Sequence, residues 1–121
     1  MSMTMPFDLD KTGKIDLSAI YDRPDPRRYY QTLFNLDYQI PAVAEANFRA
    51  VINARRQSRE RSRIALLDVG SSYGVNAAIL NHKVSLPDLF LLYSRQSSKD
   101  LSRSELVVRD RKLFAEMRLD R

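Results

Sequence analysis

The sequence predicts an α/β fold that is mostly helical, with one strand and an incomplete sheet. The continuous apolar run Ile64–Val69 enters a glycine turn at Gly70–Gly74, which is typical of a strand covered on both faces. Elsewhere apolar residues recur at three- and four-residue spacing, which indicates helices. One strand alone leaves its backbone donors and acceptors unpaired, so the neighbouring strands of the predicted sheet are missing.

The first half of the chain is predicted to hold a polar arm and two helices. Residues 1–14 form the arm, and Asp25-Pro26 supplies an N-cap and a first-turn proline for a short helix that ends near Asn35. A longer helix starts at Pro41. Its spacing places on one apolar face the residues Val43, Ala44, Asn47, Phe48, Val51 and Ile52.

The second half is predicted to be helical after the glycine turn. Helical spacing resumes at Val75 and continues to about Val84. Pro87–Tyr93 suits either a second strand or a helix, and helix is favoured because Pro87 followed by Asp88 is typical of a helix start. Ser102–Glu105 has the form of a capping box, which opens a helix that runs to about Arg118.

Composition restricts the class of protein. The 121 residues are 44% apolar and 29% charged, which is ordinary for a globular domain. No apolar run approaches the roughly 20 residues that span a bilayer, and the N-terminus has acidic residues and no apolar segment typical of a secretory signal. Cysteine is absent, which excludes disulfides and thiolate chemistry. We therefore expect a cytoplasmic protein without membrane contact.

The net charge is +5, and arginines are concentrated at Arg55–Arg63, which reads RRQSRERSR. Cations near the end of a helix interact favourably with its dipole, so this run suits a solvated helix end and linker. A phosphate-contacting patch is the other interpretation. No aromatic residue interleaves with the arginines to stack a base, so nucleic-acid binding is disfavoured.

The turn Asp68-Val69-Gly70-Ser71-Ser72-Tyr73-Gly74 has to be compared with several templates. In a dinucleotide fingerprint Ser72 would replace the second glycine and obstruct the pyrophosphate. Gly70–Gly74 also satisfies G-x-S-x-G, with Ser72 as the nucleophile of a serine hydrolase. That alternative requires several preceding strands and a distant histidine, whereas the single His82 lies ten residues after Ser72.

The run LLDVGSSYGVNAAIL resembles the first motif of class I S-adenosylmethionine-dependent methyltransferases, which has the form (Asp/Glu)-x-Gly-x-(Gly/Ser/Ala)-x-Gly. The upstream segment IYDRPDPRRYYQTLFNLDYQIP resembles the helical cap of a bacterial subgroup. The resemblance implies a Rossmann-like methyltransferase fold. It implies an N-terminal arm and helical cap over residues 1–63 and the start of a truncated cofactor-binding domain over residues 64–121.

The resemblance also implies a cofactor site and a fragmentary enzyme. The residues expected along the methionine side of S-adenosylmethionine are Asp68, Gly70, Ser71, Ser72, Tyr73 and Gly74. No metal site is expected, and neither catalytic residues nor a methyl acceptor can be named. The chain is expected to be an N-terminal portion of the enzyme that does not catalyse transfer alone.

A non-enzymatic alternative remains open. In that interpretation the chain is a mostly helical partner module that self-associates through the unpaired strand and its apolar helix faces. Tyr29, Tyr30 and Tyr38 are candidates to close over a ligand, but packing is the favoured role for them. His82 is expected on a helix surface.

Overall fold

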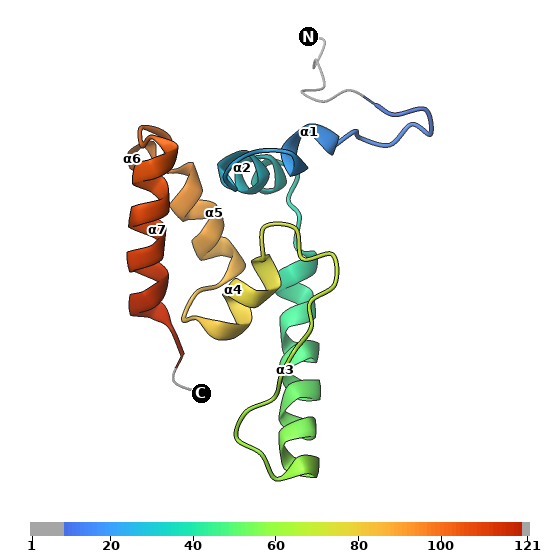
Figure 1. Ribbon diagram of the computed structural model, residues 1–121. Helices are drawn as coiled ribbons and strands as arrows, with labels where there is room; N and C mark the ends of the chain where they lie inside the picture. Colours follow the sequence, from blue (N-terminus) through green and yellow to red (C-terminus); the bar gives the residue numbers. More distant parts are fainter. Residues whose placement is uncertain (1–8, 120–121) are drawn as a thin grey trace.

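The computed structural model describes residues 9–119, and this part of the chain is built from helices. In chain order they are α1 (Ser18–Tyr21), α2 (Arg27–Asn35), α3 (Ile40–Arg59), α4 (Val75–Asn81), α5 (Leu86–Ser94), α6 (Gln96–Lys99) and α7 (Arg103–Met117) (Figure 1). The described residues form no strand. Their extended pairing is limited to two isolated antiparallel bridges, Leu9–Ile15 and His82–Arg118.

The predicted α/β fold is therefore wrong, and so is the Rossmann-like sheet that the resemblance implied. Ile64–Val69 carries no regular secondary structure, and its backbone forms no hydrogen bond within residues 9–119. Leu66, Leu67 and Val69 are 59%, 86% and 83% exposed, whereas a strand covered on both faces would be buried. The apolar run has the composition of a strand, but the described chain offers no neighbour with which it could pair.

The predicted helices are confirmed at α2, α5 and α7. Pro87–Tyr93, which the sequence left ambiguous, lies within α5. The Ser85 hydroxyl accepts a hydrogen bond from the Asp88 N–H at 3.2 Å, and the Asp88 carboxylate accepts one from the Ser85 N–H at 2.9 Å. Ser102 and Glu105 form the predicted capping box, with distances of 3.2 and 3.0 Å. Each box satisfies two N–H groups that a helix start leaves unpaired.

Helix α3 is present as predicted from the proline at its start, but its apolar face remains largely in solvent. Val43, Phe48 and Val51 are 71%, 42% and 69% exposed, and Pro41 is the buried residue of this helix. In Figure 1 the second half of α3 extends past the other helices, while α4 lies beside its first half. The apolar spacing thus identifies the helix and leaves open what covers it.

The core lies where α2 packs against α5. The rings of Tyr30 and Tyr93 stack there with centroids 4.8 Å apart, and Leu89 is fully buried. The buried cluster draws on α1, α2, α4, α5 and α7, and its members are Ile20, Tyr29, Tyr30, Leu33, Val75, Ile79, Leu86, Leu89, Phe90, Leu92, Tyr93 and Leu106. These residues come from both sides of the predicted boundary at residue 63.

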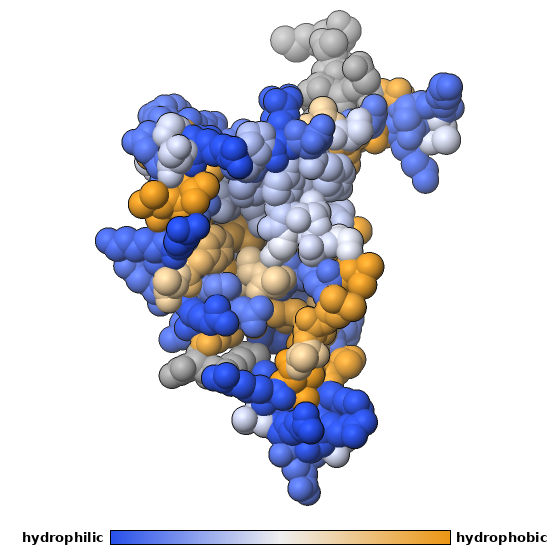
Figure 2. Space-filling model, viewed as in Figure 1, coloured by the Kyte–Doolittle hydropathy of each residue, from blue (hydrophilic) through white to orange (hydrophobic). Residues whose placement is uncertain are grey.

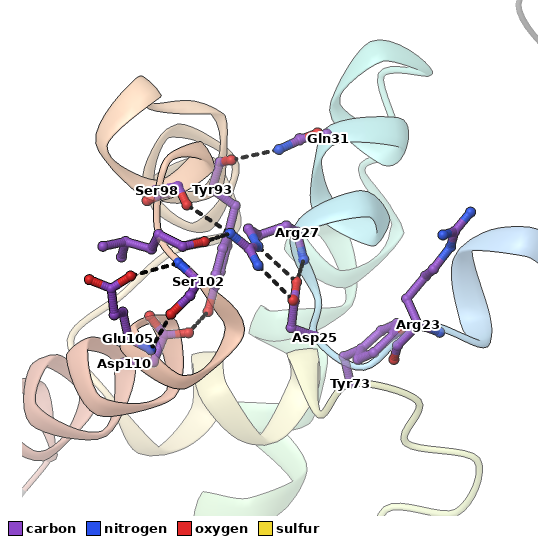
Figure 3. A network of polar contacts seen from close by, with 11 residues as sticks. Arg23, Asp25, Arg27, Gln31, Tyr73, Tyr93, Ser98, Ser102, Glu105 and Asp110 are labelled. Carbon is purple, nitrogen blue, oxygen red and sulfur yellow. Dashed lines mark hydrogen bonds and ion pairs between the residues drawn. The ribbon is translucent and has the colours of Figure 1, made fainter.

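Polar contacts fasten α2 to the C-terminal helices (Figure 3). Arg27 forms an ion pair with Asp25 at 2.9 Å and donates to the carbonyl oxygens of Ser98 and Leu101. The hydrogen bond from Arg27 holds the pKa of Asp25 below its usual range. Within residues 9–119 no helix is both long and apolar enough to cross a bilayer.

Candidate functional site

The glycine turn is a tight left-handed connection into α4. Gly70, Ser72 and Gly74 have φ angles of 70°, 52° and 76°, a region that glycine enters without the steric penalty of a side chain. The Gly74 N–H donates to the Ser71 carbonyl oxygen at 2.8 Å, and the Gly74 carbonyl accepts the first bond of α4 from Ala78 at 2.9 Å. The two glycines therefore allow the chain to reverse sharply before the helix.

Three of the predicted site residues line one pocket, here called the turn pocket. Gly70, Ser71 and Ser72 form one wall of this cavity, which has a volume of about 230 Å³. The remaining wall comes from α1, α2, the α2–α3 connection and the starts of α3 and α4: Tyr21, Tyr29, Tyr38, Ile40, Pro41, Ala44, Phe48, Val75 and Asn76. The fold thus brings a backbone turn against three tyrosines that are more than 30 residues away in sequence.

The tyrosines make this pocket aromatic and uncharged. Tyr29 is buried, and its ring packs edge-on against the ring of Tyr21, with the two ring centroids 5.9 Å apart. Burial raises the pKa of the Tyr29 phenol to about 12, so this phenol stays neutral at physiological pH. Tyr30 does not line the pocket, because its ring is stacked on Tyr93 in the core.

Tyr73 and Gly74, also predicted as site residues, do not line the turn pocket. The Tyr73 hydroxyl lies 2.8 Å from the carbonyl oxygen of Ile20 and accepts a hydrogen bond from the Arg23 N–H at 3.1 Å (Figure 3). Its ring packs against Tyr29 at 5.2 Å. Tyr73 therefore fastens the turn to the end of α1, and in the described structure its role is structural.

Asp68, the remaining predicted site residue, also lies outside the turn pocket. Its Oδ2 atom is buried and has no hydrogen-bond partner among residues 9–119. A buried carboxylate oxygen without a donor is unfavourable. Asp68 thus differs from the exposed Ser71 and Ser72 in having a buried polar atom without a partner among residues 9–119.

The serine hydrolase alternative gains no support from the surroundings of His82. The Nδ1 atom of His82 lies 2.9 Å from the Ala78 carbonyl oxygen, and its ring packs edge-on against Phe114 at 5.1 Å. Those contacts direct the imidazole to α4 and α7. No described contact joins it to Ser72, whereas a general base must lie within hydrogen-bond reach of the nucleophile.

The tyrosine wall is what sequence reasoning missed. The sequence favours packing roles for Tyr29 and Tyr38 and predicts no site role for Tyr21. No group of acidic or histidine side chains within the described residues is arranged to hold a metal ion.

No family model, curated protein or solved structure matches this chain, so the assignment of a function depends on the residues alone.

Proposed function

We propose that the turn pocket binds the methionine end of S-adenosylmethionine and that the chain is the cofactor-binding part of a methyltransferase. The observation that carries this proposal is the position of Gly70, Ser71 and Ser72 opposite three tyrosines. These three residues belong to the motif that resembles the methyltransferase motif. The proposal assigns cofactor binding to this chain and assigns no residue to the transfer step.

The chemistry of the pocket suits the sulfonium ion of the cofactor. A ligand cation close to aromatic faces is attracted by the ring quadrupoles, with a stabilisation of about 0.5–2 kcal/mol. Tyr21, Tyr29 and Tyr38 supply such faces, and no acidic or basic side chain lines the pocket. Binding by ring faces also explains why a site for a cation contains no carboxylate.

The size of the pocket indicates that it holds one end of the cofactor. Its volume of about 230 Å³ is below the roughly 300–1,000 Å³ of sites that enclose a drug-sized ligand. Methyl transfer also depends on aligning the acceptor with the methyl–sulfonium bond. We therefore expect the isolated chain to bind the cofactor weakly and to show no transferase activity.

The test compares S-adenosylmethionine with S-adenosylhomocysteine, which lacks the methyl group and the positive charge. Calorimetric titration of the full chain should give tighter binding of the charged compound. Tyr21→Ala should weaken that binding by about threefold or more, which corresponds to the cation–aromatic term. Tyr21 is 53% exposed, so the fold should tolerate the change.

Phe34→Ala provides the matched control. Phe34 is 51% exposed and pairs with Phe90 at 5.6 Å, but it does not line the turn pocket. This variant should bind the cofactor as the unchanged protein does. Equal weakening in the two variants, or no binding of S-adenosylmethionine at millimolar concentration, would refute the proposal.

A second candidate function, self-association, is favoured by the exposed apolar segment Ile64–Val69. Figure 2 shows a hydrophobic (orange) band along the course that this segment follows in Figure 1. Contiguous exposed apolar surface is a mark of interaction sites, and unpaired extended backbone can add to a second chain. Sedimentation of the unchanged protein should then show a dimer, and Leu67→Glu should yield a monomer. A protein that is monomeric at all concentrations excludes this function.

A further inference from the structure

A second cavity lies at the other end of the segment that leads into the glycine turn, where α3 ends. It has a volume of about 490 Å³, and three of its lining residues are Arg56, Arg63 and Arg118. The other lining residues are Ile52, Ile64, Leu66, Leu80, Asn81 and Leu119. We call it the arginine pocket. Figure 2 shows the hydrophilic (blue) surface at this end of the molecule.

The three arginines reach the cavity from separate parts of the chain. Arg56 is in the last turn of α3, Arg63 is in the extended segment, and Arg118 directly follows α7. Backbone hydrogen bonds hold the end of α7 against the end of α4: Lys83 N–H donates to the Met117 carbonyl, and Leu119 N–H to the Asn81 carbonyl, both at 2.8 Å. The position of Arg118 is thereby fixed by backbone contacts on both sides.

The positive charge around this cavity is uncompensated within the described structure. No acidic residue lines the pocket, and the ion pairs among residues 9–119 involve other arginines, namely Arg27, Arg49 and Arg109. The Nε atom of Arg56 is buried and has no hydrogen-bond partner there. The Nη1 atom of Arg56 donates to Asn53 Oδ1 at 3.3 Å, which leaves Nε as the buried unpaired donor. A buried unpaired donor of one arginine, in a cavity that two further arginines line, is a pattern that a bound anion would satisfy.

A favourable interaction with the helix dipole explains only part of this arrangement. It accounts for Arg56 and Arg59 in the last turn of α3. It does not account for Arg63 or Arg118, because neither lies in that turn. Their convergence on one cavity with Arg56 requires a separate explanation.

We propose that the arginine pocket binds a small phosphate monoester with an apolar organic body. Guanidinium groups match the oxygens of phosphate bidentately, and three of them suit a dianion. The aliphatic side chains of Ile52, Ile64 and Leu80 line the same cavity and provide contact for the organic part. A volume of about 490 Å³ is within the range of small-molecule sites.

The experiment is a calorimetric titration of the full chain with phenyl phosphate, inorganic phosphate and phenol. Phenyl phosphate should bind most tightly, inorganic phosphate more weakly, and phenol should not bind. Arg63→Ala and Arg118→Ala should each weaken phenyl phosphate binding by about tenfold, as expected for one charge-assisted hydrogen bond. Both arginines are exposed, so the melting temperature should change little.

Arg111→Ala is the matched control, because Arg111 is an exposed arginine of α7 that does not line the pocket. It removes the same charge and should leave phenyl phosphate binding unchanged. Absence of phenyl phosphate binding, or equal weakening by Arg111→Ala, overturns the proposal. Tighter binding of a short single-stranded oligonucleotide than of phenyl phosphate, with the same dependence on Arg63, also overturns it in favour of nucleic acid.

The outcome is independent of the proposed cofactor site. The arginine pocket and the turn pocket share no lining residue. Arg63→Ala should therefore leave the dissociation constant for S-adenosylmethionine unchanged, and Tyr21→Ala should leave that for phenyl phosphate unchanged. Failure of one proposal can thus be recognised without reference to the other.

Discussion

The two leucines Leu89 and Leu91 of α5 provide the sharpest test of the helical fold. Leu89 is completely buried, whereas Leu91 is 54% exposed. In a strand, residues two apart point to the same face and would share one environment. In a helix the same two residues lie about 200° apart and experience different surroundings. Replacing each by alanine therefore measures the conformation of the segment that the sequence left ambiguous.

The expected magnitudes follow from burial. Leu89→Ala removes buried carbon atoms and leaves a cavity in the packing between α2 and α5, which destabilises a protein by about 2.7–5 kcal/mol. Leu91→Ala removes a side chain that is about half in solvent, so it forfeits roughly half of a transfer free energy of about 2 kcal/mol and creates no enclosed cavity. We expect about 3–4 kcal/mol at Leu89 and about 1 kcal/mol or less at Leu91.

Urea unfolding followed by circular dichroism measures both variants against the unchanged protein. With a dependence on urea of about 1–3 kcal/mol per molar, Leu89→Ala should lower the midpoint by about 1–4 M. Leu91→Ala should lower it by less than about 1 M. Equal destabilisation by the two variants would refute the helical assignment of α5 and restore the possibility of a strand over Pro87–Tyr93.

Other predictions concern titration and helix ends. Burial raises the pKa of Tyr29 to about 12 and also raises the pKa of Tyr93. The stability contributed by the neutral Tyr29 phenol is therefore complete below the unfolded pKa of about 10 and is lost as the pH rises through about 12. As the pH is raised, the ultraviolet absorbance of tyrosinate should reach its final value only where circular dichroism shows that the protein unfolds. Full ionisation of the tyrosines in a protein that is still folded would contradict this prediction. Glu60→Gly should stabilise the protein by about 0.5–1 kcal/mol in thermal melts, because Glu60 ends α3 with a φ of 51°; a loss of stability would contradict it. Ser102→Ala should destabilise the protein by about 1 kcal/mol, because the N-cap hydrogen bond of α7 is lost. Ser104→Ala, at the second residue of α7, should destabilise it less; a larger effect of Ser104→Ala than of Ser102→Ala would contradict the capping box.

Local signals allowed the helices to be predicted. The capping residues Ser102 and Glu105 act within one turn, so their effect can be recognised in a short stretch of sequence. The same is true of Pro41, which marks the start of α3. The second capping box, Ser85 with Asp88, is equally local, and it would have decided between strand and helix for Pro87–Tyr93.

The strand predicted over Ile64–Val69 is absent from the described structure, because a strand forms only where a neighbouring segment pairs with it. Ile64–Val69 has the continuous apolar character of a buried strand, yet pairing is a property of two segments. The apolar face of α3 shows the same difficulty. Its spacing identifies a helix, but Val43 and Val51 remain exposed, because no described element covers them. Sequence patterns indicate which surfaces could be buried and do not show what buries them.

The candidate site was predictable only on the side where it is continuous in sequence. Gly70, Ser71 and Ser72 of the motif line the turn pocket, whereas the Tyr73 hydroxyl contacts the end of α1. The opposing wall of Tyr21 and Tyr29 comes from segments more than 40 residues earlier. Packing of α2 on α5 positions Tyr29, and no local pattern around the glycines contains that information.

The segment that fails as a strand connects the two cavities. Arg63, Ile64 and Leu66 line the arginine pocket, and Gly70–Ser72 line the turn pocket. Between them the backbone has no sheet hydrogen bonds within the described structure, so contacts at its two ends contribute much of what fixes its course. Because the two pockets share no lining residue, a substitution at one end of the segment tests one pocket without removing a side chain from the other.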